Sequence, residues 1–260
     1  MREAVVHSQP RSPYNGHRFA AGLRRLGYKT PERRARILDA SDVAVFWNRH
    51  ECHEKIIAEY ERVGAPVLIV ENGYFGRTWL GRNWHALALG QHNGLGTWPQ
   101  GDDARWDSLS VEIKPWKTDG REIVILAQRG IGSVRARQPA GWVKATADRI
   151  EKSAKRAVRI REHPGPQNAA PKRTLEQDLA NAWCAVTWGS SAAIKAIALG
   201  IPVFHALPQW IGSPAARPLE QDIEDRFLGD PLPMFRRLAW AMAPIEEIES
   251  GEALKGLLKC

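Results

Sequence analysis

The sequence is poor in cysteine, has no long apolar run and does not start like a signal peptide, and each absence argues against a class of protein. Cysteine occurs three times in 260 residues without a Cys-x-x-Cys pair, which argues against a disulfide framework or a cysteine-rich zinc site. No apolar run approaches the roughly 18–20 residues that cross a bilayer. The start, MREAVVHSQPRSPYNG, has no apolar core of signal-peptide length. We therefore expect a cytoplasmic protein.

The remaining composition is that of a globular protein with a positive charge. Hydrophobic residues make up 43% and charged residues 25%, and the formal net charge is +8. Basic residues gather at 11–36 and 144–161, whereas residues 220–252 are comparatively acidic. A basic half suits an anionic partner such as nucleic acid, a membrane surface or a phosphorylated substrate. Basic runs on helices are as often plain solvated faces, so both interpretations stay open.

Strand and helix patterns alternate along the first 70 residues. The predicted strands are 3–7, 40–47 and 66–70, and the predicted helices are 15–27 and 53–63. This order is typical of a parallel sheet with helices on both faces. Residues 71–118 are rich in glycine and tryptophan, which predicts a long irregular stretch with short elements.

The alternation restarts after this stretch. Strands are expected at 122–126, 158–161, 184–187 and 202–204, and helices at 142–157, 175–181 and 191–199. Two such sets predict an α/β fold with two Rossmann-like domains facing a cleft. We place an N-terminal domain at 1–117, a C-terminal domain at 118–232 and a closing helical segment at 233–260, with helices at 233–242 and 245–258.

The most informative segment follows the strand at 184–187 and reads TWGSSAAIKAIALGIPV. Ser190 stands at the expected N-cap of a helix and Ser191 at its first position, with small residues in the first turn. A helix N-terminus with hydroxyls and free N–H groups suits an anion. A plain α/β turn with a good cap would show the same residues, so that alternative stays open.

Two more segments follow strands of the same predicted domain. His163-Pro164 stands at a strand end, where open α/β sheets bind ligands, and a histidine there can donate to a phosphate oxygen. Gly130 and Gly132 come shortly after the first strand of this set. They lack the third glycine and the acidic residue of the dinucleotide fingerprint, which argues against NAD.

In the first half, Glu71 and Asn72 end the apolar strand and precede Gly73 and Arg77. A carboxylate at a strand end that faces a cleft can act as a general base. The same residues could simply cap the turn after the strand, and that alternative also stays open.

These segments occur in an order that resembles a known group of enzymes. An acidic-x-Gly motif at Glu71, a His-Pro at His163 and a serine pair opening a helix that runs to Gly-x-Pro-Val are similar to motifs of GT-B glycosyltransferases. The similarity is to the bacterial sialyltransferase and capsule Kdo-transferase group. The order of the predicted elements is similar over most of the chain, but the motifs themselves cover only these short segments. It implies transfer of a sugar from a nucleotide-sugar donor to an acceptor hydroxyl.

The resemblance also implies roles for single residues. Glu71 would be the catalytic base, and Asn72 occupies the position of a second acidic residue. Arg77 would meet a phosphate or the acceptor. The residues that would bind the nucleotide sugar are Gly130, Gly132, His163, Pro164, Ser190, Ser191 and Lys195.

Two residues depart from the pattern of this group. Asn72 replaces an acid, so only Glu71 could be the base from this motif. Lys195 stands where many relatives have glutamate, and a lysine there favours a more anionic ligand.

We expect the reaction to need no metal and no other cofactor. His50, Cys52, His53 and Glu54 could bind a metal, but no further ligand stands at a plausible spacing. The absence of any Asp-x-Asp triplet argues against the metal-dependent GT-A class. The helix dipole and basic side chains would then stabilise the departing phosphate.

The sequence leaves the acceptor open. The resemblance favours an envelope or capsule glycan, whereas the basic stretches and tryptophans favour a hydroxymethylated base in DNA, as in phage-type DNA glycosyltransferases. Two other functions stay open as well. One is a sugar-nucleotide epimerase or hydrolase, and the other is a non-catalytic nucleic-acid-binding α/β module.

Overall fold

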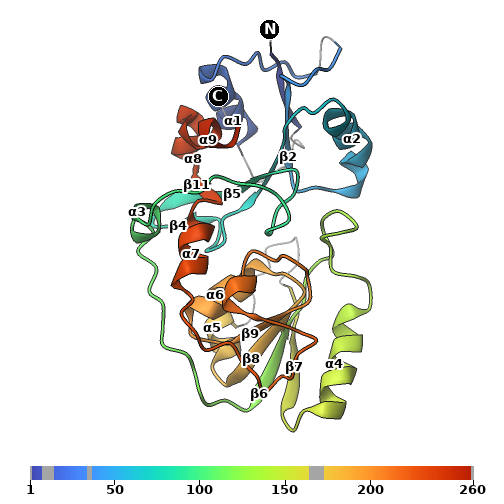
Figure 1. The fold of residues 1–260 in the computed structure, drawn as a ribbon, viewed down its shortest axis with the longest axis vertical. Helices are drawn as coiled ribbons and strands as arrows, with labels where there is room; N and C mark the ends of the chain where they lie inside the picture. The colour runs from blue at the N-terminus through green and yellow to red at the C-terminus, as the bar shows by residue number, and fades with distance from the viewer. Residues whose placement is uncertain (1, 8–14, 34–36, 164–172, 259–260) are drawn as a thin grey trace. The chain divides into compact units, whose positions relative to one another are not determined.

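The computed structural model describes residues 2–7, 15–33, 37–163 and 173–258, and its contacts divide the chain into two compact units (Figure 1). Unit 1 comprises Met1–Arg105, Gly132–Arg135 and Arg237–Cys260, and unit 2 comprises Trp106–Ile131 and Ala136–Arg236. The C-terminal residues therefore belong to the same unit as the N-terminal ones. The division into an acceptor domain and a nucleotide-sugar domain stays a prediction about function.

Unit 1 is built on a six-stranded mixed sheet. Its elements, with η for a 3-10 helix, are β1 (Ala4–His7), α1 (Gly16–Arg25), β2 (Val43–Trp47), η1 (Glu51–His53), α2 (Glu54–Arg62), β3 (Val67–Asn72), β4 (Thr78–Trp79), β5 (Arg82–Leu89), β11 (Met242–Pro244), α8 (Ile245–Ser250) and α9 (Glu252–Leu258). The strand order is β1-β2-β3-β5-β11, and β4 pairs with β5. Strands β1, β2 and β3 are parallel, as predicted, and β5 is antiparallel to both of its main neighbours.

The strands of unit 1 form because both of their faces find apolar partners. In β2, Val43 and Val45 pack toward α1, α8 and α9, while Ala44 and Phe46 pack toward α2. Side chains of successive strand residues point to opposite faces, so a strand buried on both sides is apolar throughout. The apolar runs at 43–47 and 67–70 therefore predict this sheet directly.

Strand β5, with eight residues, is longer than the short elements predicted within the irregular stretch at 71–118. Residues 84–88 are all buried in the middle of the sheet. Gly81 and Gly90, both with positive φ, bound the strand and give the sequence the composition of a loop. The sheet is mixed rather than parallel because this strand runs against β3.

The C-terminal prediction is also partly wrong. The helix expected at 233–242 is α7 (Leu232–Ala239), and β11 follows it instead of a further helical turn. The helix expected at 245–258 is divided into α8 and α9 at Gly251, whose φ is +86°. Glycine adopts this left-handed conformation readily and ends helices there.

Unit 2 is an open parallel sheet with helices. Its elements are β6 (Glu122–Leu126), α4 (Trp142–Ser153), β7 (Ala157–Arg161), α5 (Leu175–Leu179), β8 (Ala182–Thr187), α6 (Ser191–Ala198), β9 (Val203–His205), η2 (Ser213–Ala215) and β10 (Arg217–Pro218), while α3 (Ala104–Asp107) and α7 lie at the boundaries between the units. The strand order is β10-β9-β8-β6-β7, and all pairs are parallel. The expected α/β class with parallel strands is confirmed. Within the described ranges, no helix combines the length and apolar character that a bilayer crossing needs.

Candidate functional site

The strand order of unit 2 places a candidate ligand site at the carboxyl ends of β6 and β8. From β6 the chain goes to β7 on one side and then to β8 on the other. Open α/β sheets bind ligands where the order reverses in this way, because the two outgoing loops diverge there. The segments that leave this point are the loop after β6, with Gln128, and the turn from Thr187 to Ser190.

Polar side chains hold this turn in place. Ser190 is the N-cap of α6, and its Oγ accepts from the Ala192 N–H at 3.1 Å. Thr187 Oγ1 accepts from the Ser190 N–H, and Gln128 Oε1 accepts from the Gly189 N–H, both at 2.9 Å. The predicted cap is therefore confirmed, and Ser191 lies exposed beside it at the first helical position. The resulting helix start is rigid and carries the positive end of the helix dipole.

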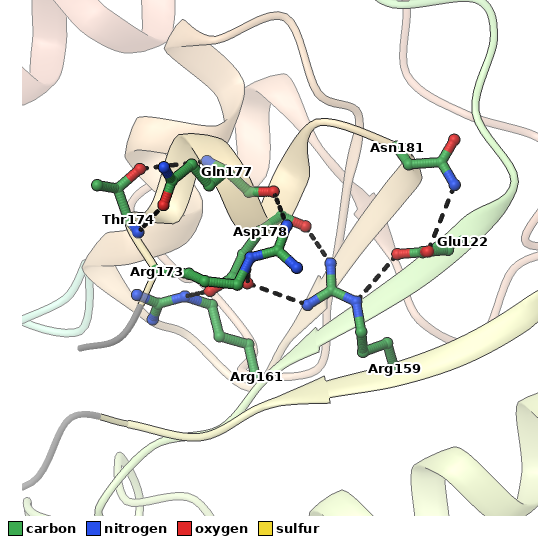
Figure 2. Close-up of polar contacts among 8 residues, drawn as sticks. All are labelled: Glu122, Arg159, Arg161, Arg173, Thr174, Gln177, Asp178 and Asn181. Carbon is green, nitrogen blue, oxygen red and sulfur yellow. Dashed lines mark hydrogen bonds and ion pairs between the residues drawn. The ribbon is translucent and has the colours of Figure 1, made fainter.

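A network of arginines surrounds Asp178 on the β7 side of the sheet (Figure 2). The Asp178 carboxylate accepts from Arg161 Nε at 2.8 Å, and Arg159 Nη1 and Arg173 Nε each lie 3.3 Å from it. Arg159 Nε also donates to Glu122 at 2.9 Å. Three guanidinium groups face two carboxylates, so this region keeps a positive excess.

Lys195 and His163 lie within the electrostatic influence of this network. The pKa of Lys195 is lowered by burial and by the charge of Arg161, although Glu176 opposes the shift. The pKa of His163 is lowered by burial and by the charges of Arg129 and Arg161. At neutral pH His163 is therefore a neutral hydrogen-bonding group. The cations around it suit an anionic ligand.

A second candidate site lies in unit 1 at the carboxyl ends of β2 and β3, around Glu71. His92 Nε2 lies 3.5 Å from Glu71 Oε1. The Asn48 amide, with its NH2 group toward Glu71, donates to the same oxygen, and its own oxygen accepts from Trp47 Nε1 at 3.3 Å. The Glu71 side chain remains 28% exposed, whereas His92 is 6% exposed. A partly exposed carboxylate held by buried donors can accept a proton from a ligand.

Two more buried side chains border Glu71. The pKa of Tyr74 is raised strongly by burial and by the Glu71 charge, so this phenol stays protonated. The pKa of His85 is lowered to about 4 by burial and by the charge of Arg77, against a hydrogen bond to the Glu71 carbonyl. His85 is therefore neutral at pH 7 and fixes the strand rather than the carboxylate.

The other residues predicted beside Glu71 are Asn72, Gly73 and Arg77, and they differ in exposure and packing. Asn72 is exposed and, as the next residue of the strand, points to the opposite face from Glu71. Arg77 is exposed at the surface. At Gly73 an added Cβ would lie 2.8 Å from Trp84 Cβ, so the glycine of the motif permits close packing of the turn against β5.

The predicted nucleotide-binding residues divide between the units. Gly130, Ser190, Ser191, Lys195 and His163 belong to unit 2. Gly132 belongs to unit 1 together with Ser133, whose hydroxyl accepts from Gln91 Nε2. Pro164 lies outside the described residues. The roles assigned to these residues stay predictions.

The histidines at the start of α2 make aromatic contacts. The ring of His53 lies 5.0 Å from that of Phe46 and 5.9 Å from that of His50. Among the described residues, no group of three or more histidine, cysteine or acidic side chains could hold a metal ion. Cys52 and Cys184 are free thiols, the first exposed and the second buried.

Sequence reasoning missed Asn48 and His92. Asn48 directly follows β2, so its place at the same sheet edge as Glu71 was a usable signal. His92 follows β5, the strand that was not predicted, and nothing in the local sequence connects it with Glu71.

Solved structures with similar folds include two transferases. No protein-family model and no curated protein sequence matches the chain. The beta Kdo 2,4 transferase of Thermosulfurimonas dismutans KpsC superposes with a TM-score of 0.59 at 13% identity, over 91% of this chain and 89% of that chain. The beta Kdo 2,7 transferase of the same protein gives 0.58 at 13% identity, over 97% and 99%. The chain has a glycosyltransferase-like fold.

Proposed function

We propose that this protein is a GT-B-type glycosyltransferase that moves a sugar from a nucleotide-sugar donor to an acceptor hydroxyl without a metal ion. The observation that carries the proposal is the likeness to two Kdo transferase structures along nearly the whole chain. The partly exposed carboxylate of Glu71 supplies the base that such a reaction needs. Fold alone does not fix an activity, so the proposal depends on both observations together.

The donor binds unit 2 in this proposal. The start of α6, with Ser190 and Ser191, receives the phosphate, because its N–H groups and dipole favour negative charge. His163 donates to the phosphate or ribose as a neutral imidazole. Lys195 lies on α6, and Gly130 lies in the loop after β6. The positive charges of Lys195 and of the arginines around Asp178 stabilise the departing nucleotide.

The acceptor is activated in unit 1. Glu71 takes the proton of the acceptor hydroxyl while that oxygen forms a bond to the anomeric carbon. The bond from that carbon to the phosphate oxygen breaks, and the nucleotide leaves with the electron pair. Arg77, exposed near the end of β3, contacts a phosphate or the acceptor. Asn72, next to Glu71, and Gly132 have no assigned step in this reaction.

We propose a glycan rather than a DNA base as the acceptor. Two basic stretches and the tryptophans favour DNA in the sequence, but in the stretch at 144–161 most of the cations have intramolecular partners. Arg156 pairs with Glu224, Arg159 with Glu122, and Lys144 with Asp148. Charges engaged in this way contribute little to binding phosphates along a DNA duplex.

A thermal-shift panel of CMP, UDP, GDP and dTDP, each with its sugars, tests the donor site. We expect one nucleotide to raise the Tm of the wild type, because ligand binding to the folded state stabilises it. His163→Ala should abolish the increase, and the exposed His17→Ala control should keep it. The same increase in His163→Ala would contradict the assigned site, and no increase with any nucleotide would contradict the proposed function.

A binding titration with duplex DNA across salt concentrations tests the acceptor. We expect no more than weak binding. Tight binding that falls steeply with salt would instead support the DNA acceptor.

A further inference from the structure

The Asn48 amide donates to one oxygen of Glu71, and His92 Nε2 lies 3.5 Å from the same oxygen. Both His92 Nε2 and the Asn48 amide face Oε1. A carboxylate only accepts hydrogen bonds, so the histidine nitrogen that faces it carries the proton. The other ring nitrogen, Nδ1, is buried and has no hydrogen-bond partner among the described residues. In ligand-free structures such contacts are often long and tighten when the substrate binds.

The second oxygen of Glu71 is left available. Within the described part of the sequence, no side chain donates to Oε2. The Glu71 side chain is 28% exposed, so a ligand can approach the residue. The carboxylate thus has one oxygen held by the protein and one that a hydroxyl can approach.

The backbone holds Asn48 in an uncommon conformation. Its φ is +60°, and its N–H donates to the Val70 carbonyl at 2.9 Å, on the strand that carries Glu71. Residues other than glycine rarely adopt this region, and asparagine tolerates it better than most. Strained backbone of this kind persists where the surrounding structure fixes it, often at functional sites.

We infer that His92 and Asn48 are positioning residues that fix Glu71 Oε1, so that Oε2 is the atom that takes the proton of the acceptor hydroxyl. This inference rests on the proposed function of Glu71. Neither residue touches the acceptor. Each acts by restricting the rotation of the carboxylate, and misplacement of a catalytic group by a small distance costs much of the rate.

Steady-state kinetics with matched variants tests the inference. His92→Phe keeps an aromatic ring but loses the donor, and His92→Gln restores an N–H near the position of Nε2. Asn48→Gly keeps the left-handed backbone and removes the amide. We expect kcat to fall about tenfold to a hundredfold in His92→Phe and Asn48→Gly, with KM for both substrates nearly unchanged. His92→Gln should recover most of kcat. Equal losses in His92→Phe and His92→Gln, or a change confined to KM, would overturn the inference.

An NMR measurement separates this inference from the proposed function, because it needs no activity. The ring ¹⁵N signals of His92 should show a proton on Nε2, the nitrogen that faces Glu71, and the Glu71 carboxylate ¹³C signal, assigned with Glu71→Gln, should move in His92→Phe. If the wild type transfers no sugar but these signals behave as expected, the proposed function fails and the hydrogen-bond arrangement stands. A His92 ring without a proton on Nε2, or a Glu71 signal that does not respond, overturns the inference whatever the activity.

Discussion

Glu71 in unit 1 and Asp178 in unit 2 are both carboxylates that several side chains contact, yet their surroundings differ in charge. Asp178 is 12% exposed and faces three arginines. Glu71 is 28% exposed and faces an amide and a histidine, with one oxygen left available. Three guanidinium groups occupy the Asp178 carboxylate, which leaves little room for a ligand hydroxyl. The Glu71 carboxylate has fewer contacts and more exposure, so the comparison separates a structural carboxylate from a candidate base.

The largest effect is expected from Glu71→Gln. Glutamine keeps the size and hydrogen bonds of the side chain but cannot take the acceptor proton, so sugar transfer should fall roughly a thousandfold. The Tm should change little. The measurement is the rate of product formation with the donor identified by thermal shift. Glu252→Gln, exposed on α9 of the same unit, is the control, and an equal loss in both variants would contradict the assignment.

The converse variant is Asp178→Asn. It removes the negative charge that three arginines share, which should lower the free energy of unfolding by about 3 kcal/mol. Catalysis by the remaining folded protein should persist. Denaturant unfolding measures the first effect, and Asp148→Asn serves as control because Asp148 forms an exposed pair with Lys144. The free energy of unfolding of that control should fall by no more than about 0.5 kcal/mol. An equally small fall in Asp178→Asn would show that the Asp178 network does not stabilise the fold.

An intermediate effect is expected from acid, through His85. Its pKa in the folded state is about 4, below the ordinary 6.5, mainly because of burial. The unfolded chain therefore binds the proton first, and the stability that depends on neutral His85 is complete above pH 6.5 and lost as the pH falls toward 4. Between pH 7 and 4.5 the wild type should lose about 2 kcal/mol more than His85→Phe. The phenylalanine keeps the ring contacts with Phe19 and Trp47. Parallel stability curves for the two proteins would contradict this account.

The smallest effect is expected at Ser190. Ser190→Ala removes the N-cap of α6 and should cost about 1 kcal/mol of stability. Ser190→Thr keeps a hydroxyl and should cost less. If the Ser190 hydroxyl also binds the nucleotide sugar, the affinity for nucleotide should fall in Ser190→Ala and recover in Ser190→Thr. An unchanged affinity for nucleotide in Ser190→Ala would show that Ser190 only caps the helix.

The sequence predicted the elements whose signals are local. The apolar runs of β2, β3, β6 and β8 and the serine cap of α6 each depend on neighbouring residues. The structure contains them within one or two residues of their predicted bounds, apart from β2, which starts three residues late. The capping hydroxyl of Ser190 bonds to an N–H two residues away, a distance that sequence reasoning can judge.

The elements that were missed depend on distant partners. Strand β11 has three residues and exists because it pairs with β5, more than 150 residues earlier in the chain. The contact between His92 and Glu71 likewise depends on the antiparallel return of β5 beside β3. No local pattern encodes such pairing, because the partners meet only in the folded sheet.

The most direct test of the central claim is the intact mass of an acceptor glycan after incubation with the purified protein and the stabilising nucleotide sugar. The account predicts that the acceptor gains the mass of one sugar, that free nucleotide appears in equal amount, and that Glu71→Gln produces neither. Nucleotide release without any gain in acceptor mass would point to a hydrolase and would contradict the account.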